Sequence, residues 1–164
     1  MKDLIITTKI QVYEIDESNE ETKNLIAKAK DVTKNSYSPY SQYAVGAAIL
    51  LANGEIIAGS NQENAAYPSG LCAERTALFY ANSSHPDCTI KAIAITAFYQ
   101  DDFVKEVCTP CGACRQVIAE IEGKQNSPIK ILMCSKNTVY EAESIKSLLP
   151  LSFGSRQLST DSDN

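Results

Sequence analysis

The chain has 164 residues, 44% of them hydrophobic, which fits one compact domain with a sizeable core. Its formal net charge of -5 and pI near 4.9 disfavour a polynucleotide partner, because no basic stripe is available to track a phosphate backbone. No run reaches the roughly 18 apolar residues of a membrane helix, and the N-terminus lacks a secretory pattern, so we expect a cytoplasmic protein with no membrane partner.

The first half of the chain predicts a helix followed by a β-hairpin. Residues 20–35 place apolar side chains at helical spacing, with acidic residues at the start and lysines later, as the helix dipole favours. Residues 43–51 and 55–58 read as strands on either side of Asn53-Gly54, which is typical of a tight turn. Two antiparallel strands are therefore expected here.

The second half predicts alternating helices and strands. Residues 72–82 have helix-forming composition with Cys72 in the first turn, and residues 90–98 read as a buried strand. Residues 111–122 form an amphipathic helix that we expect to end at Gly123. The order suggests a single mixed sheet of about five strands covered by helices. Three shorter elements are expected after Gly123: strands at 129–134 and 138–141 and a helix at 144–149.

Three cysteines and one glutamate have the spacing of a catalytic zinc site. Cys72 and Glu74 are separated by one residue, and Cys111 and Cys114 form a Pro-Cys-x-x-Cys segment. A structural zinc usually has four protein ligands, whereas a catalytic zinc has three and leaves the fourth position for water. Zinc deaminases use such a set, with a glutamate that is not a ligand. The pattern predicts metal ligands at the three cysteines and proton transfer by Glu74.

Both predicted half-sites lie at the start of a helix, where free backbone N-H groups and the positive end of the dipole stabilise thiolates. Three thiolates and a hydroxide around one Zn²⁺ leave a net negative charge. Arg75, next to Glu74, is the cation expected to balance part of it.

Cys108 leaves two other metal assignments open. Together with Cys111 and Cys114 it forms Cys-x-x-Cys-x-x-Cys, which also opens an iron–sulfur motif. That motif would continue with Cys-Pro where this chain has Ile118 and Ala119. The second alternative is a closed structural zinc with Cys108 as an additional ligand, although we expect Cys108 to point into the core.

The other cysteines and the one histidine have no partner at ligand spacing. Cys88 and Cys134 are expected to behave as small buried hydrophobic residues. His85 precedes Pro86 in a predicted loop, so it is neither an expected ligand nor an expected base. This excludes histidine-based triads as the leading interpretation.

The chain resembles cytidine deaminases from about residue 38 to residue 154. The resemblance is carried by the segments 38–48, 72–77, 110–116 and 148–154. It implies a three-layer α/β/α sandwich around a five-stranded mixed sheet. It also implies the small, all-cysteine type of the family, with one Zn²⁺ per subunit, in a homotetramer whose active sites lie at subunit interfaces.

The resemblance also assigns sugar-binding residues. In Asn61-Gln-Glu63-Asn-Ala65-Ala-Tyr67-Pro, Asn61 and Glu63 would hold the 3'-hydroxyl of the ribose, since an amide and a carboxylate offer a donor and an acceptor. Ala65 and Tyr67 would lie near a neighbouring site, and Phe153 would cross a subunit boundary to cover the base. An Asn-x-Glu loop alone is usually only a turn, and Phe153 alone would be an ordinary core aromatic.

The base and the reaction centre have expected partners as well. Tyr43 stands where the family commonly has a stacking phenylalanine, and its hydroxyl needs a partner or water. Glu74 would take a proton from water, pass it to N3 of the pyrimidine and later help the amine leave as ammonia. The Ala73 N-H would meet the base carbonyl, and the carbonyl of Thr109 or Cys111 would accept a hydrogen bond from the amine.

The resemblance implies hydrolytic deamination of cytidine and deoxycytidine to uridine and deoxyuridine, in pyrimidine salvage. The expected partner is a small nucleoside, and no nucleic acid is expected. The alternatives are a deaminase of a related substrate, such as blasticidin or a polynucleotide cytosine or adenine, and a closed structural zinc module.

The two ends of the chain lie outside the expected deaminase domain at 19–154. Residues 1–18 precede the first helix of short family members, and residues 6–13 alternate with the period of a strand. This extension could add an edge strand, cover a subunit contact or be a disordered leader. Residues 155–164 are expected to form a mobile tail.

Overall fold

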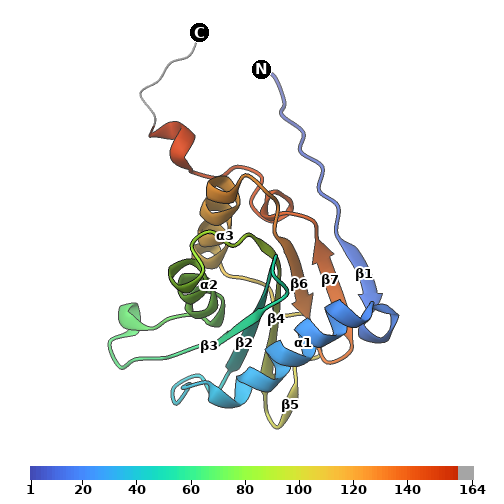
Figure 1. The fold of residues 1–164 in the computed structure, drawn as a ribbon, viewed down its shortest axis with the longest axis vertical. Helices are drawn as coiled ribbons and strands as arrows, with labels where there is room; N and C mark the ends of the chain where they lie inside the picture. The colour runs from blue at the N-terminus through green and yellow to red at the C-terminus, as the bar shows by residue number, and fades with distance from the viewer. Residues whose placement is uncertain (159–164) are drawn as a thin grey trace.

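A seven-stranded mixed sheet lies between helices on both of its faces (Figure 1). The computed structural model describes residues 1–158. The strands are β1 (Gln11–Glu14), β2 (Ala44–Leu51), β3 (Ile56–Ser60), β4 (Ile90–Tyr99), β5 (Asp102–Phe103), β6 (Lys130–Cys134) and β7 (Thr138–Ala142). The α-helices are α1 (Glu20–Val32), α2 (Ala73–Ser84) and α3 (Gly112–Gln125).

The strand order is β1-β7-β6-β4-β2-β3, and β5 pairs with β4. Strands β4 and β6 run parallel, because α3 crosses over between them, and the other described pairs are antiparallel. The predicted hairpin is β2 and β3, with Ala48 opposite Ala58. The mixed sheet expected from the order of elements is confirmed.

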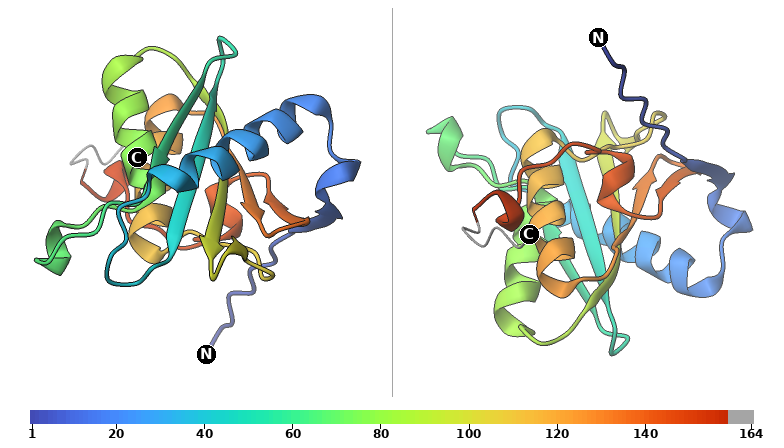
Figure 2. Two further views of the ribbon diagram at one scale, coloured as in Figure 1. Left: turned by 90° about the horizontal axis from the view of Figure 1, so that it is seen from below. Right: turned by 90° about the horizontal axis from the view of Figure 1, so that it is seen from above.

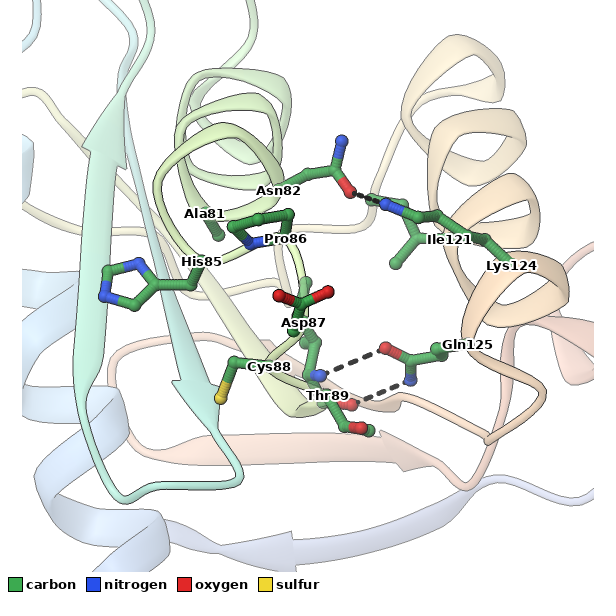
Figure 3. A pocket seen from close by; sticks show the side chains of 11 residues that line it. Ala81, Asn82, His85, Pro86, Asp87, Cys88, Thr89, Ile121, Lys124 and Gln125 are labelled. Atoms are coloured by element: carbon green, nitrogen blue, oxygen red, sulfur yellow. Dashed lines mark hydrogen bonds between the residues drawn. The ribbon is translucent and has the colours of Figure 1, made fainter.

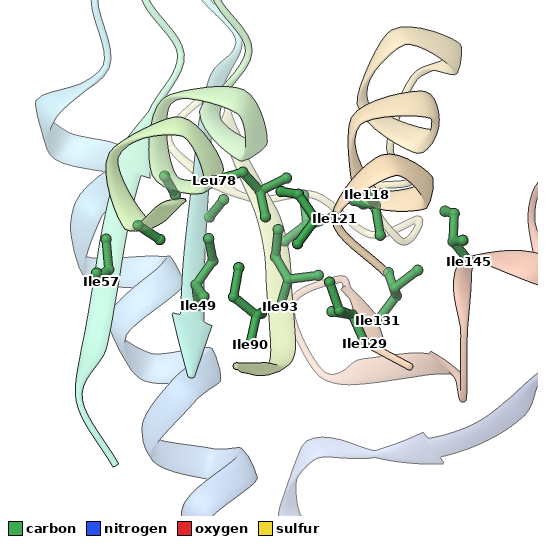
Figure 4. Packing of buried hydrophobic residues seen from close by; sticks show 14 of the residues in the cluster. Ile49, Ile57, Leu78, Ile90, Ile93, Ile118, Ile121, Ile129, Ile131 and Ile145 are labelled. Atoms are coloured by element: carbon green, nitrogen blue, oxygen red, sulfur yellow. The ribbon is translucent and has the colours of Figure 1, made fainter. Parts of the chain in front are cut away.

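Helix α1 covers one face of the sheet, and α2 with α3 covers the other (Figure 2). This arrangement confirms the three-layer α/β/α sandwich. Figure 4 shows isoleucine and leucine side chains of β2, β4 and β6 meeting those of α2 and α3 in the larger of two cores. The smaller core, under α1, contains Leu25, Ile26, Ala29, Ala48, Leu50, Ala92, Ala94, Leu132, Cys134 and Val139.

Two glycines bring helices close to the strands that lead to the site. A Cβ on Gly46 of β2 would lie 2.9 Å from Thr33 Cγ2 and closer still to the Ala29 carbonyl oxygen of α1. A Cβ on Gly59 of β3 would lie 2.7 Å from the Ala77 nitrogen of α2. Since real Cβ atoms do not approach backbone this closely, only glycine permits these helix–strand contacts.

The prediction of five strands is wrong in number, because β1 and β5 bring the sheet to seven strands within residues 1–158. Strand β1 comes from the N-terminal extension and pairs with β7 at the sheet edge, where Tyr13 Oη donates a 2.6 Å hydrogen bond to Glu141 Oε2. The strand spans Gln11–Glu14 rather than the whole alternating segment. Strand β5 follows a turn in which Gln100 and Asp101 have positive φ angles.

Three predicted boundaries also differ. Helix α3 continues past Gly123 and ends before Asn126, whose left-handed conformation (φ 49°) terminates it. The helix expected at 144–149 is only a 3-10 turn at Ile145–Ser147. Ser155–Gln157 of the predicted mobile tail form another 3-10 turn, and residues 159–164 lie outside the described part of the chain. Among residues 1–158, no helix combines the length and apolar character needed to span a membrane.

Candidate metal centre

The Sγ atoms of three cysteines meet at the N-terminal ends of α2 and α3. Cys72 and Cys111 Sγ are 3.9 Å apart, Cys111 and Cys114 Sγ are 3.6 Å apart, and all three lie within 4.8 Å of one another. Cys114 is buried, Cys72 is half-buried and Cys111 is exposed. The cluster is thus open to solvent on one side.

The helix starts place these thiols. Cys72 is the N-cap of α2 and Cys111 is the N-cap of α3, each in an extended conformation, while Cys114 lies in the first turn of α3. Cys72 had been expected one position further, inside the first turn. The free N-H groups and positive dipole ends of two helices therefore face the same sulfur cluster and favour thiolates.

The spacing of the sulfurs fits a zinc ion. Two thiolates bound to one tetrahedral zinc at about 2.3 Å are roughly 3.8 Å apart. Two of the separations in the cluster, 3.9 and 3.6 Å, bracket that distance. Three soft sulfur ligands also suit zinc in preference to magnesium or calcium.

Cys108 is not part of the sulfur cluster. Within residues 1–158, the only grouping of three or more potential metal ligands consists of Cys72, Cys111 and Cys114. Cys108 packs against the main core, and burial raises the pKa of its thiol to about 12, with Glu74 and Tyr43 as further neighbours. Its position outside the sulfur cluster argues against both alternatives that used Cys108.

Hydrogen bonds within the cluster favour a thiolate at Cys72. A hydrogen bond from Cys114 lowers the pKa of Cys72 to about 5, with further contributions from Arg75 and Cys111. The pKa of Cys114 is raised in turn, because Cys114 keeps the proton that it shares with Cys72. Arg75 Nη2 lies 3.6 Å from Cys72 Sγ, so its positive charge faces the cluster.

Glu74 lies beside the sulfur atoms and is almost completely buried from solvent. It belongs to the first turn of α2 and is only 4% exposed. Burial raises the pKa of its carboxyl, and the neighbouring Cys72 thiolate adds to the effect. A carboxyl of this kind accepts and releases protons closer to neutral pH than an exposed glutamate does.

A cavity of about 560 Å³ opens next to the cluster, along the segment between β3 and α2 that projects away from the sheet (Figure 1). Its volume suits a small molecule rather than a polymer. The lining includes Asn61, Glu63, Tyr67, Cys72 and Arg75. Four side chains singled out in the sequence, together with one metal-ligand candidate, thus border one cavity.

Asn61 and Glu63 also hold the cavity wall together. Asn61 Oδ1 accepts hydrogen bonds from the Val45 N-H (2.8 Å) and the Ser36 hydroxyl (2.6 Å), while its Nδ2 donates to the Tyr43 carbonyl (2.9 Å). One amide hydrogen is left for another acceptor. Asn61 is therefore more than a turn residue.

Glu63 is bound through one of its oxygens. Its Oε2 accepts hydrogen bonds from the backbone N-H groups of Tyr40 (2.9 Å) and Ser41 (3.3 Å). A hydrogen bond from the Ser41 side chain lowers the pKa of Glu63, so the group is ionised at neutral pH. Tyr40 and Ser41 also line the cavity, which was not expected of them, although both lie in the Ser-Pro-Tyr-Ser segment that carries the resemblance.

Three other residues expected near substrate, Tyr43, Ala65 and Phe153, do not line the cavity in a single chain. The Tyr43 ring packs against the Tyr99 ring, with centroids 5.7 Å apart, and burial raises the Tyr43 pKa to about 12. Phe153 is 58% exposed, and Ala65 is also exposed without lining the cavity. Tyr67 does line it, but is 75% exposed and touches the Tyr40 ring edge-on.

The histidine lies at the opposite end of α2. His85 caps the C-terminus of this helix and borders a second cavity of about 160 Å³ (Figure 3). Its Nε2 lies 3.0 Å from Glu55 Oε2, and its ring points away from that cavity toward β3. As the sequence indicated, His85 has no place among the candidate ligands.

An α/β/α sandwich with three thiols, a buried carboxylate and an adjoining small-molecule cavity has the features of a zinc-dependent deaminase. The family described as "Cytidine and deoxycytidylate deaminase zinc-binding region" matches residues 19–127. The chain belongs to this cytidine deaminase family, and it is a hydrolytic deaminase by that membership.

Relatives and solved structures agree with this family assignment. The chain is 38% identical to the cytidine deaminase of Sporosarcina psychrophila over 85% of this chain and 96% of the relative. It is 46% identical to that of Halalkalibacterium halodurans over 59% of this chain and 69% of the relative. The crystal structure of cytidine deaminase from Burkholderia pseudomallei superposes with a TM-score of 0.66, at 34% identity, covering 80% of this chain and 98% of that one. The Mycobacterium tuberculosis enzyme gives a TM-score of 0.62 at 29% identity, with coverage of 80% and 96%.

Proposed function

We propose that this protein deaminates cytidine and deoxycytidine hydrolytically, giving uridine and deoxyuridine with ammonia, in pyrimidine salvage in the cytoplasm. The observation that carries the proposal is that Cys72, one of the three cysteines clustered beside Glu74, borders a cavity that Asn61 and Glu63 also line. The acidic protein and the volume of the cavity support a nucleoside over a polynucleotide.

In this proposal Cys72, Cys111 and Cys114 hold one Zn²⁺ per subunit. When bound, zinc supplies a Lewis acid that makes water acidic enough to serve as a nucleophile near neutral pH. Arg75 balances part of the thiolate charge, because its guanidinium lies 3.6 Å from Cys72 Sγ. The buried Arg75 Nε has no hydrogen-bond partner within the described residues, so this donor is not used by the protein itself.

Glu74 moves the protons of the reaction. It takes a proton from the attacking water and delivers it to N3 of the pyrimidine, which makes C4 more electrophilic. It then helps to protonate the amino group, which leaves as ammonia. The Ala73 N-H binds the base carbonyl, and the carbonyl of Thr109 or Cys111 accepts a hydrogen bond from the amine. The burial of Glu74 supports this role, since it brings the carboxyl pKa nearer to the working pH.

Asn61 and Glu63 bind the 3'-hydroxyl of the ribose. Asn61 has one amide hydrogen to donate, and the ionised Glu63 carboxylate is an acceptor. Their hydrogen bonds to residues 36–45 keep both groups oriented before the sugar arrives, which reduces the entropy lost on binding.

We further propose a homotetramer in which neighbouring subunits complete each site with Ala65, Tyr67 and Phe153. The exposure of the two aromatic rings supports it, because large aromatic side chains are usually at least half covered. Tyr43 contributes an aromatic face to the base in that assembly. In this proposal the catalytic domain spans residues 19–154, with residues 1–18 as an extension. Sedimentation that finds only monomers would refute the tetramer.

The direct test is the loss of cytidine absorbance on conversion to uridine. Glu74→Gln should keep the zinc content of the wild type and lose roughly a hundredfold or more of the turnover, the usual contribution of a general acid–base. Glu120→Gln, at an exposed position of α3, is the matched control. An active Glu74→Gln enzyme would remove Glu74 from its central role.

The same assay separates the alternatives. Replacing Cys72, Cys111 or Cys114 with serine should abolish zinc binding together with activity, as measured by metal analysis. Zinc content without turnover on any nucleoside would favour a structural zinc module. Turnover confined to blasticidin, tRNA or single-stranded DNA would favour a deaminase of a related substrate.

A further inference from the structure

The two residues that follow Cys114 hold two distant segments of backbone. Arg115 Nε donates a 2.9 Å hydrogen bond to the Pro110 carbonyl, and its Nη1 donates a 3.0 Å bond to the Leu148 carbonyl. Gln116 Nε2 donates a 2.8 Å bond to the Phe153 carbonyl. The first turn of α3 therefore contacts both the turn before Cys111 and the C-terminal segment at residues 148–153, here called the closing segment.

The bond to Pro110 acts on a metal-ligand candidate. Pro110 is buried, and its carbonyl belongs to the peptide unit that leads directly into Cys111. Holding this carbonyl fixes the plane of that peptide and thus the direction in which the Cys111 side chain leaves the backbone. Arginine suits the task, because its planar guanidinium donates in two fixed directions at once, whereas lysine offers a single flexible ammonium.

The closing segment depends on such contacts because it has little other support. Residues 148–154 form no helix or strand in the described structure. Leu148 and Leu149 pack against the main core, but Leu151 is 73% exposed and Phe153 is 58% exposed. Beyond Leu149, the bond from Gln116 to the Phe153 carbonyl thus ties the described segment to the rest of the fold. Gln157 adds two local bonds, because it accepts one from the Gly154 N-H and donates one to the Ser152 carbonyl.

We infer that Arg115 and Gln116 are positioning residues that couple the second metal half-site to the closing segment. Arg115 orients Cys111 through the Pro110 carbonyl and holds the start of the closing segment, while Gln116 holds its end. The part of this inference that concerns KM for cytidine rests on the proposed function. Coupling between two sites is reciprocal. Zinc bound at the cysteines should therefore reduce the motion of residues 148–153, and a change that increases that motion should lower the affinity for zinc.

Hydrogen exchange and zinc affinity test the coupling without relying on activity. In the wild type, zinc should slow amide exchange in residues 148–153 relative to the metal-free protein. Arg115→Met should abolish that difference in exchange and lower the affinity for zinc roughly tenfold or more, which is the usual effect of losing a group that orients a metal ligand. Arg115→Lys should recover part of both effects, because lysine can reach one carbonyl at a time. Lys124→Gln, which removes a charge and a single side-chain bond at the far end of α3, is the matched control.

Gln116→Leu separates the two arms of the inference. It should speed exchange around Phe153 and raise KM for cytidine several-fold while leaving zinc affinity unchanged, since the Pro110 contact is intact. Wild-type zinc affinity and exchange in Arg115→Met would overturn the inference, as would equal effects in Lys124→Gln. If Arg115→Met does not fold, wild-type zinc affinity and exchange in Arg115→Lys, together with wild-type exchange around Phe153 in Gln116→Leu, would overturn the inference instead. A wild type that couples zinc to the closing segment but does not deaminate nucleosides would refute the proposed function alone.

Discussion

A buried carboxylate in the last part of α3 should be one of the most sensitive positions for stability. Glu122 is 8% exposed and accepts three hydrogen bonds. Its Oε1 accepts from the backbone N-H groups of Ile129 (2.8 Å) and Ile145 (2.9 Å), and its Oε2 accepts from the Ser144 hydroxyl (2.8 Å). Glu122 thus ties α3 to the start of β6 and to the turn before the closing segment.

The cost of removing this carboxylate follows from the partners that it leaves behind. Glu122→Leu leaves two buried backbone N-H groups without an acceptor. Each unsatisfied group costs about 1–3 kcal/mol, so the free energy of unfolding should fall by about 2–6 kcal/mol. That is a large share of the roughly 5–15 kcal/mol that stabilises a typical domain. Glu122→Gln keeps an oxygen for the two N-H groups and loses only the charge, so we expect about 1–2 kcal/mol.

Urea unfolding at one protein concentration and one zinc concentration measures these differences, because both a bound metal and self-association shift apparent stability. Glu120→Leu, two residues earlier and exposed, should stay within about 0.5 kcal/mol of the wild type. The reasoning fails if Glu122→Leu unfolds at the wild-type midpoint. It also fails if glutamine and leucine cost the same.

Three further outcomes are expected. Gly46→Ala should destabilise the protein by about 1–3 kcal/mol in thermal unfolding, since its Cβ would meet the Ala29 carbonyl; an unchanged Tm would show that α1 can move away. Glu63→Gln should raise KM for cytidine roughly tenfold with little change in kcat, and a selective fall in kcat would contradict a sugar-binding role. Burial and the bond to Glu141 raise the pKa of Tyr13, so its contribution to stability is complete below the ordinary tyrosine pKa near 10 and is lost as pH rises toward the raised value. Tyr13→Phe should therefore be less stable than the wild type at pH 8 and lose less stability by pH 11; parallel urea midpoints across that range would refute this account.

The elements that the sequence predicted well are those with strong local patterns. Helix α1 shows the expected buried face, and its N-cap Asn19 accepts a hydrogen bond from the Thr22 N-H, a local signal. The hairpin of β2 and β3 follows from Asn53-Gly54 and the runs around it. Strand β5 was not predicted, because the turn before it requires positive φ angles at Gln100 and Asp101. Neither residue type indicates that conformation as strongly as glycine does.

The candidate site divides in a similar way. The cysteines and Glu74 were predictable because zinc chemistry requires those residue types at those spacings. The exclusion of Cys108 from the cluster needed the structure, since Cys108 has the same spacing to Cys111 as Cys111 has to Cys114. Tyr43 was expected against the base, yet within one chain its ring packs on Tyr99.

Residue types and spacings along the chain were enough to predict the candidate metal ligands, most of the order of helices and strands, and the family. The tertiary structure decided which distant groups meet. Arg115 reaches both Pro110 and Leu148, and Glu122 reaches both Ile129 and Ile145. Such contacts depend on how α3 lies against its neighbours in space, which no local pattern of side chains specifies.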